Sequence, residues 1–145
     1  MTIAFETEET VNAARTDVWA RFTDWTRAQQ WLPGVSSVSA DGETTDGTIL
    51  RFNSEHHPHG EGATAILHDV VPFQKLTLTT VSGDVSADYR YSFTGTGNAT
   101  RILLVADVAV TGDSESLAES IRERIANAER QQLALLKKAI ETEIR

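Results

Sequence analysis

The C-terminal segment carries a helical pattern without an internal break, from residue 113 to Arg145. A helix of about 30 residues is about 45 Å long, and in a small domain it needs a broad apolar surface to lie on. We expect Asp113 or Ser114 to cap it. One stripe at helical spacing contains Leu117, Ile121, Ile125, Ala128, Gln132, Leu135 and Ala139. The rest of the chain must therefore supply the apolar surface.

The segment from Val35 to Gly112 supplies that surface as a series of short strands. Turn pairs such as Asp41-Gly42 and Gly83-Asp84 separate the strands, and links this short join antiparallel neighbours, because a parallel crossover needs about a dozen residues. The alternation is clearest in residues 85–93, where one side is expected to carry Val85, Ala87, Tyr89, Tyr91 and Phe93. We therefore predict an antiparallel sheet with one apolar and one polar face.

The N-terminal residues add one strand and two short helices. A period of two predicts a first strand whose buried face carries Ile3, Phe5, Thr7 and Val11. At Thr16, the expected N-cap, the period becomes helical and continues through Val18, Phe22 and Trp25. A second helical piece, residues 26–32, must end at Pro33-Gly34.

This order of elements predicts one α+β domain over residues 1–145, since no linker, repeat or low-complexity segment divides the chain. We expect an antiparallel sheet of about seven strands, strongly curved around the long C-terminal helix. A twisted sheet cannot lie flat against a straight helix, so the sequence predicts an internal cavity between the two.

Charge and composition exclude several classes of protein. The chain has 21 Asp and Glu against 13 Lys and Arg, a net charge of −8, which disfavours binding to nucleic acid. It has no cysteine, and its longest apolar run, residues 102–110, is far shorter than the ~20 residues of a membrane-spanning helix. We expect a cytoplasmic protein, a monomer or homodimer, without cofactor or metal.

Two N-terminal stretches carry a family resemblance. Residues 11–19, followed by Thr23-Asp24-Trp25 and by residues 31–35, are similar to the N-terminal signature of the START-like, birch-pollen-allergen-fold superfamily (SRPBCC). Residues 70–76 resemble the hairpin that follows the fourth strand of that fold. The chain departs from the pattern at Arg15-Thr16, where proline is frequent.

Within the superfamily, the nearest group is the polyketide cyclase/dehydrase and lipid-transport proteins. The resemblance implies a helix-grip fold with a hydrophobic cavity for lipids, polyketides, quinones or similar molecules. Members include both enzymes and carriers, so the resemblance does not identify a ligand.

Ligand contacts are expected where the apolar face of the sheet meets the C-terminal helix. The tyrosine hydroxyls could hold a carbonyl or enolate oxygen, or the rings could simply pack in the core. Gln132 could contact the ligand, bond a backbone carbonyl or lie at the exposed edge of the helix. Trp31 could gate a pocket mouth or anchor the second helix. The expected contacts are Trp31, Phe52, Ser54, His56, Tyr89, Tyr91, Phe93, Leu104, Ile121, Ile125, Ala128, Gln132 and Leu135.

Three residues are candidates for acid–base catalysis. Glu9 could be a pocket carboxylate, unless a bulge in the first strand returns it to water. His68 is the best candidate if it points inward, but both faces of its strand are equally apolar. His56 lies in the run 55–59, where neighbouring side chains point to opposite faces, so three or four metal ligands would not converge. The alternative is a hairpin tip whose histidines titrate near neutrality.

Three functions remain open. The first is binding or carrying of a small hydrophobic ligand, with affinity from apolar burial. The second is a polyketide cyclase or dehydratase type of enzyme that uses cavity His, Glu and Tyr residues. The third is a protein-interaction module that uses the outer face of the sheet or the long helix.

Overall fold

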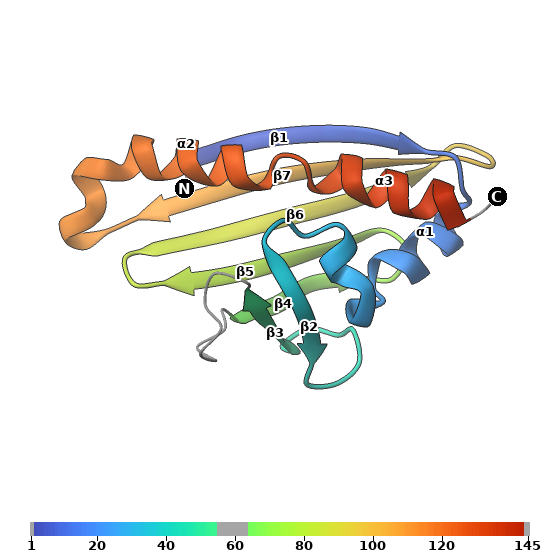
Figure 1. Ribbon diagram of the computed structural model, residues 1–145, viewed down its shortest axis with the longest axis horizontal. Coiled ribbons are helices and arrows are strands. Elements are labelled where there is room, and N and C mark those ends of the chain that lie inside the picture. The colour runs from blue at the N-terminus through green and yellow to red at the C-terminus, as the bar shows by residue number, and fades with distance from the viewer. Residues whose placement is uncertain (1, 55–63, 144–145) are drawn as a thin grey trace.

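The structure, a computed structural model, describes residues 2–54 and 64–143. It confirms the α+β helix-grip prediction: a seven-stranded antiparallel sheet faces a long C-terminal helical segment (Figure 1). In chain order the elements are β1 (Thr2–Val11), α1 (Arg15–Phe22), η1 (Trp25–Gln30), β2 (Val35–Ala40), β3 (Ile49–Ser54), β4 (Thr64–Val71), β5 (Lys75–Ser82), β6 (Val85–Gly95), β7 (Thr100–Val110), η2 (Gly112–Leu117), α2 (Ala118–Glu129) and α3 (Gln132–Glu143).

The strands follow the order β1-β7-β6-β5-β4-β3-β2, so the first strand lies beside the last one. Their register aligns inward side chains in rows across the sheet. One row runs from β1 to β4 through Phe5, Ala106, Tyr89, Leu78 and Leu67. A neighbouring row contains Thr7, Leu104, Tyr91 and Leu76. The predicted inward face of β6 is therefore confirmed, with Ala87, Tyr91 and Phe93 at most 3% exposed.

The predicted inward face of β1 is wrong at one position. Ile3 is 54% exposed, because the register with β7 shifts between Ile3 and Phe5. Beyond this irregularity the alternation holds, and Phe5 and Val11 are buried.

The C-terminal segment contains a break that the sequence pattern does not predict. The helix α2 ends at Glu129 and α3 begins at Gln132, so the stripe does not continue in phase. The buried residues are Ala126, Gln132, Leu133, Leu136 and Ile140, whereas Ala128 and Leu117 of the expected stripe are exposed.

Two predicted N-caps are wrong. Thr16 lies inside α1, which follows Ala14 and has no side-chain cap. Asp113 and Ser114 lie in the 3-10 turn η2, and the α-helix begins only at Ala118.

Both C-terminal helices lie over the β1 edge of the sheet, and α1 meets the end of α3 (Figure 1). Ionic contacts hold that end in place. The buried Arg21 of α1 binds Glu143 at 3.1 Å, and Arg27 of η1 pairs with the same carboxylate. Within the described residues, no helix is long and apolar enough to cross a membrane.

Candidate functional site

Aromatic side chains pack one end of the space between sheet and helices. Phe22 is the centre, and its ring centroid lies within 6.0 Å of the rings of Trp19, Trp25, Trp31, Tyr91 and Phe93. All six side chains are at most 7% exposed. Trp31 is completely buried, so it lies in the core and not at a pocket mouth. Its Nε1 has no hydrogen-bond partner among the described residues.

The other end of the inner face is packed less completely. Three expected ligand contacts there are only half-buried: Tyr89, Ile121 and Ile125. Phe52 and Leu135 are also half-buried, and they pack against the main core cluster. A second small core cluster of Ala87, Val108 and Val110 lies beneath α2, with Ile121 and Ile125 packed against it. Among the expected contacts, Trp31, Tyr91, Phe93 and Leu104 therefore lie in the filled core, whereas Tyr89, Ile121 and Ile125 keep part of their apolar surface accessible.

A chain of polar side chains connects the sheet to the helix break. The Tyr91 hydroxyl donates to Gln132 Oε1 at 2.5 Å, and Gln132 Nε2 donates to Glu129 Oε2 at 2.7 Å. Gln132 is 2% exposed, so its amide is buried as the stripe predicted. The hydrogen-bond partners of the Gln132 amide are side chains and not a backbone carbonyl. A ligand contact for Gln132 stays a prediction.

Glu129 is the residue that the sequence reasoning missed. The helical stripe places it on the solvated side, but next to the break its carboxyl is half-buried. Burial raises the pKa of Glu129, and the hydrogen bond from Gln132 opposes this by lowering it. No salt bridge joins Glu129 to a cation among the described residues. The one sequence signal for this contact was the spacing of three residues between Glu129 and Gln132, because residues three apart in a helical pattern are neighbours.

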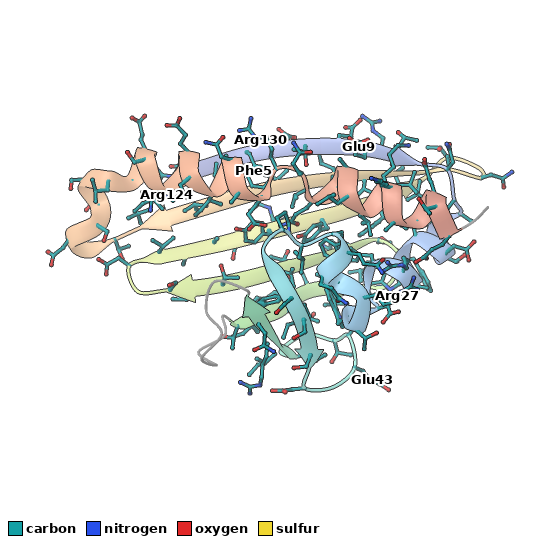
Figure 2. All side chains as sticks on the ribbon, viewed as in Figure 1. Phe5, Glu9, Arg27, Glu43, Arg124 and Arg130 are labelled. Carbon is teal, nitrogen blue, oxygen red and sulfur yellow. The ribbon has the colours of Figure 1, made fainter. Side chains whose placement is uncertain are left out.

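Tyr89 and Tyr91 face this carboxyl from β6. Burial and, second, the negative charge of Glu129 raise the pKa of Tyr89. Burial, the neighbouring Tyr89 and Glu129 raise the pKa of Tyr91 in the same way. Both phenols are therefore neutral at physiological pH and act as hydrogen-bond donors. The ring of Tyr89 also contacts Phe5, at 6.5 Å between centroids, and Figure 2 labels Phe5 beside the α2–α3 junction.

The three catalytic candidates have different outcomes. His68 is exposed, because Ala65 and Leu67 take the inward positions of β4, so its role as an inward acid or base is wrong. Glu9 is half-buried in phase with Phe5 and Val11, and the register shift of β1 lies at its other end, before Phe5. His56 lies outside the described residues, as does the side chain of Ser54.

The raised pKa of Glu129 makes stability depend on pH. The protonated Glu129 carboxyl stabilises the folded state fully below the ordinary carboxyl pKa of 4.5. This stabilisation is lost as the pH rises through the raised pKa. Glu129→Gln removes the charge. We therefore expect its free energy of unfolding, relative to that of wild type, to be higher at about pH 8 than at about pH 4. Urea denaturation at both pH values measures the gain. The exposed Glu123→Gln is the control, and an equal change in both variants would contradict the expectation.

Comparisons with known proteins agree with this architecture. Residues 2–141 match the family model described as "Polyketide cyclase / dehydrase and lipid transport". No curated protein matches the sequence.

Among solved structures, the Zhui aromatase/cyclase from Streptomyces sp. R1128 has a TM-score of 0.75 at 17% identity, covering 97% of this chain and 94% of that one. The protein TTHA0849 from Thermus thermophilus has a TM-score of 0.71 at 15% identity, covering 95% and 97%. A Thalictrum flavum norcoclaurine synthase point mutant has a TM-score of 0.71 at 15% identity, covering 97% and 95%. At these identities the likeness establishes the fold alone.

Proposed function

Because the chain belongs to the polyketide cyclase/dehydrase and lipid transport family, we propose that it binds a small hydrophobic molecule between its sheet and its C-terminal helices. One observation carries the proposal: the inner face is packed with aromatic rings around Phe22, whereas Tyr89, Ile121 and Ile125 remain half-buried. Burial of apolar ligand surface there yields about 25 cal/mol per Å², and the few polar groups orient the ligand.

Native mass spectrometry of freshly purified protein, followed by solvent extraction of the bound material, tests the proposal. We expect a hydrophobic small molecule to co-purify. The proposal would be contradicted if the protein purified without a ligand and bound none of a set of lipids, quinones and aromatic ketones.

The half-buried face also predicts a mutational effect on binding. We expect Ile125→Ala to weaken the binding of N-phenyl-1-naphthylamine about fivefold, because the loss of apolar contact costs about 1 kcal/mol. Titration of the probe's fluorescence gives the dissociation constant. Leu117→Ala is the matched control, since Leu117 is 57% exposed. Equal effects of the two variants would place the probe elsewhere.

An enzyme of the cyclase or dehydratase type is the second candidate. Glu129 favours it, because a carboxyl with a raised pKa beside a neutral phenol is suited to proton transfer. Deuterium exchange at the carbon next to the carbonyl of 2-tetralone separates the candidates. An enzyme accelerates this exchange and loses the acceleration in Glu129→Gln, whereas a carrier leaves the solvent rate unchanged.

The outer face of the sheet gives less support to a protein-interaction module. Ion pairs cross its strands, between Arg90 and Asp107 and, at 2.8 Å, between Arg101 and Glu8. The Arg101–Glu8 pair is exposed, which is typical of a solvated face, whereas Asp107 is buried and its pair with Arg90 is only partly exposed.

A further inference from the structure

We propose that the Tyr89 hydroxyl and the Glu129 carboxyl form a two-donor site for a carbonyl oxygen of the bound molecule. The inference rests on the proposed function, because the carbonyl must belong to a ligand between sheet and helices. It adds the chemical class of that ligand: a ketone, quinone or ester, and not a plain hydrocarbon.

The first argument is that both groups have unused hydrogen-bonding capacity. Tyr91 is occupied, since its hydroxyl donates to Gln132 at 2.5 Å. No hydrogen bond joins the Tyr89 hydroxyl to another described residue, although its side chain is half-buried. Glu129 accepts from Gln132 through Oε2 only, so among the described residues its Oε1 has no partner. Neither oxygen is fully buried, so each can bind water in the free protein, and a ligand atom can replace that water.

The second argument concerns position. Tyr89 lies two residues from Tyr91 on the inner face of β6, and Tyr91 is connected to Glu129 through Gln132. Glu129 also lies one helical turn after Ile125, which packs against the same small core cluster as Tyr89. Their proximity is also seen in the effect of the Glu129 charge on the Tyr89 pKa. Tyr89, Glu129 and Ile125 are all half-buried, in contrast to the fully buried Phe22 and Trp31.

The third argument concerns charge. The groups that face Glu129 are the phenols of Tyr89 and Tyr91 on β6 and the amide of Gln132 on α3, and none of them is cationic. Of the arginines near Glu129 in sequence, Arg130 donates to the carbonyl of Ala126 and Arg122 to that of Val108, and Arg124 is exposed and forms no salt bridge with Glu129. On the inner face of β1, Phe5, Thr7 and Glu9 supply no cationic group either.

A carboxyl without a cation, covered by an apolar ligand, is driven toward its protonated form. In that form it donates a hydrogen bond, as the phenol does. Two convergent donors match the two lone pairs of one carbonyl oxygen, whereas a hydrocarbon leaves both donors unpaired. The arrangement therefore discriminates between ligands by a penalty on the wrong one as well as by attraction to the right one.

The test uses 9-fluorenone and fluorene, which differ only in C=O against CH₂. We expect the wild-type protein to bind fluorenone about tenfold more tightly in competition with N-phenyl-1-naphthylamine. The infrared C=O stretch of bound fluorenone should lie below its value in a hydrocarbon solvent. Tyr89→Phe and Glu129→Leu should each reduce the preference to about threefold or less, and Glu123→Gln should leave it unchanged.

Glu129→Gln provides a second readout that does not depend on a lost side chain. Its amide remains a neutral donor, so it should keep the fluorenone preference. Fluorenone binding by wild type should weaken as the pH rises from about 5 to 9, and this dependence should disappear in Glu129→Gln. Equal affinities for the two molecules, with an unshifted C=O stretch, overturn the carbonyl site but leave ligand binding intact. Binding of neither molecule, nor of the naphthylamine probe, overturns the proposed function and the site with it.

Discussion

Trp31→Ala is expected to lower the free energy of unfolding by about 3–5 kcal/mol, the range for removal of a large buried aromatic side chain. Trp31 is 0% exposed, stacks on Phe22 with 5.1 Å between centroids and meets the edge of Tyr91 at 6.1 Å. Three elements lose packing at once, because these residues come from the segment after η1, from α1 and from β6. Urea denaturation gives the change from the midpoint at constant slope.

Two variants show whether the effect comes from packing. Trp31→Phe keeps a ring and removes an indole N–H that has no partner among the described residues, so we expect it to cost only about 1–2 kcal/mol. Phe73→Ala removes a ring that contacts Trp19 but is 41% exposed, and about 1 kcal/mol is expected. A Trp31→Ala cost as small as that of Phe73→Ala would mean that the aromatic end is not the core.

Gln132→Leu is expected to lower the free energy of unfolding by about 2 kcal/mol. Leucine has a similar volume, but it leaves the buried Tyr91 hydroxyl without an acceptor and Glu129 without its amide donor. A buried donor that loses its partner costs about 1–3 kcal/mol, which exceeds the net gain from one hydrogen bond. The measurement is again urea denaturation, at a pH where wild type is most stable.

The double variant Gln132→Leu with Tyr91→Phe makes this prediction specific. Because it removes both the hydroxyl and its acceptor, we expect a cost about 1 kcal/mol below the sum of the two single variants. Additive costs would show that the Tyr91–Gln132 bond contributes nothing. The control pair is Ser37→Ala with Asn53→Ala, an exposed hydrogen bond at 2.9 Å, for which little coupling is expected.

Local periodicity was sufficient to predict most of the fold. The alternation in β6 correctly predicted that Tyr91 and Phe93 are buried, because successive side chains of a strand point to opposite faces. Where a register changes, the same reasoning fails: Ile3 is exposed because β1 shifts against β7, and that shift depends on a strand about a hundred residues away. His68 was ambiguous for a related reason, since its strand is apolar on both faces.

The candidate site could be predicted only in part. Gln132 was identified because a single amide in an apolar stripe requires partners. Glu129 was missed, and Ala128 was wrongly placed inside, because a continuous helix was assumed across residues 130 and 131. Neither residue is glycine or proline, so no composition signal marks the break. Which polar groups share the interior follows from tertiary packing.

The pairing of β1 with β7 has a consequence for how the protein reaches its native state. Val11 pairs with Thr100, so β1 cannot pair with β7 until nearly the whole sheet has been synthesised. The entropy of closing so long a segment must be overcome before this pairing forms, which makes it a late event in refolding. Meanwhile the carboxylates of Glu6, Glu8 and Glu9 repel other nascent chains and so disfavour their association with the lone strand.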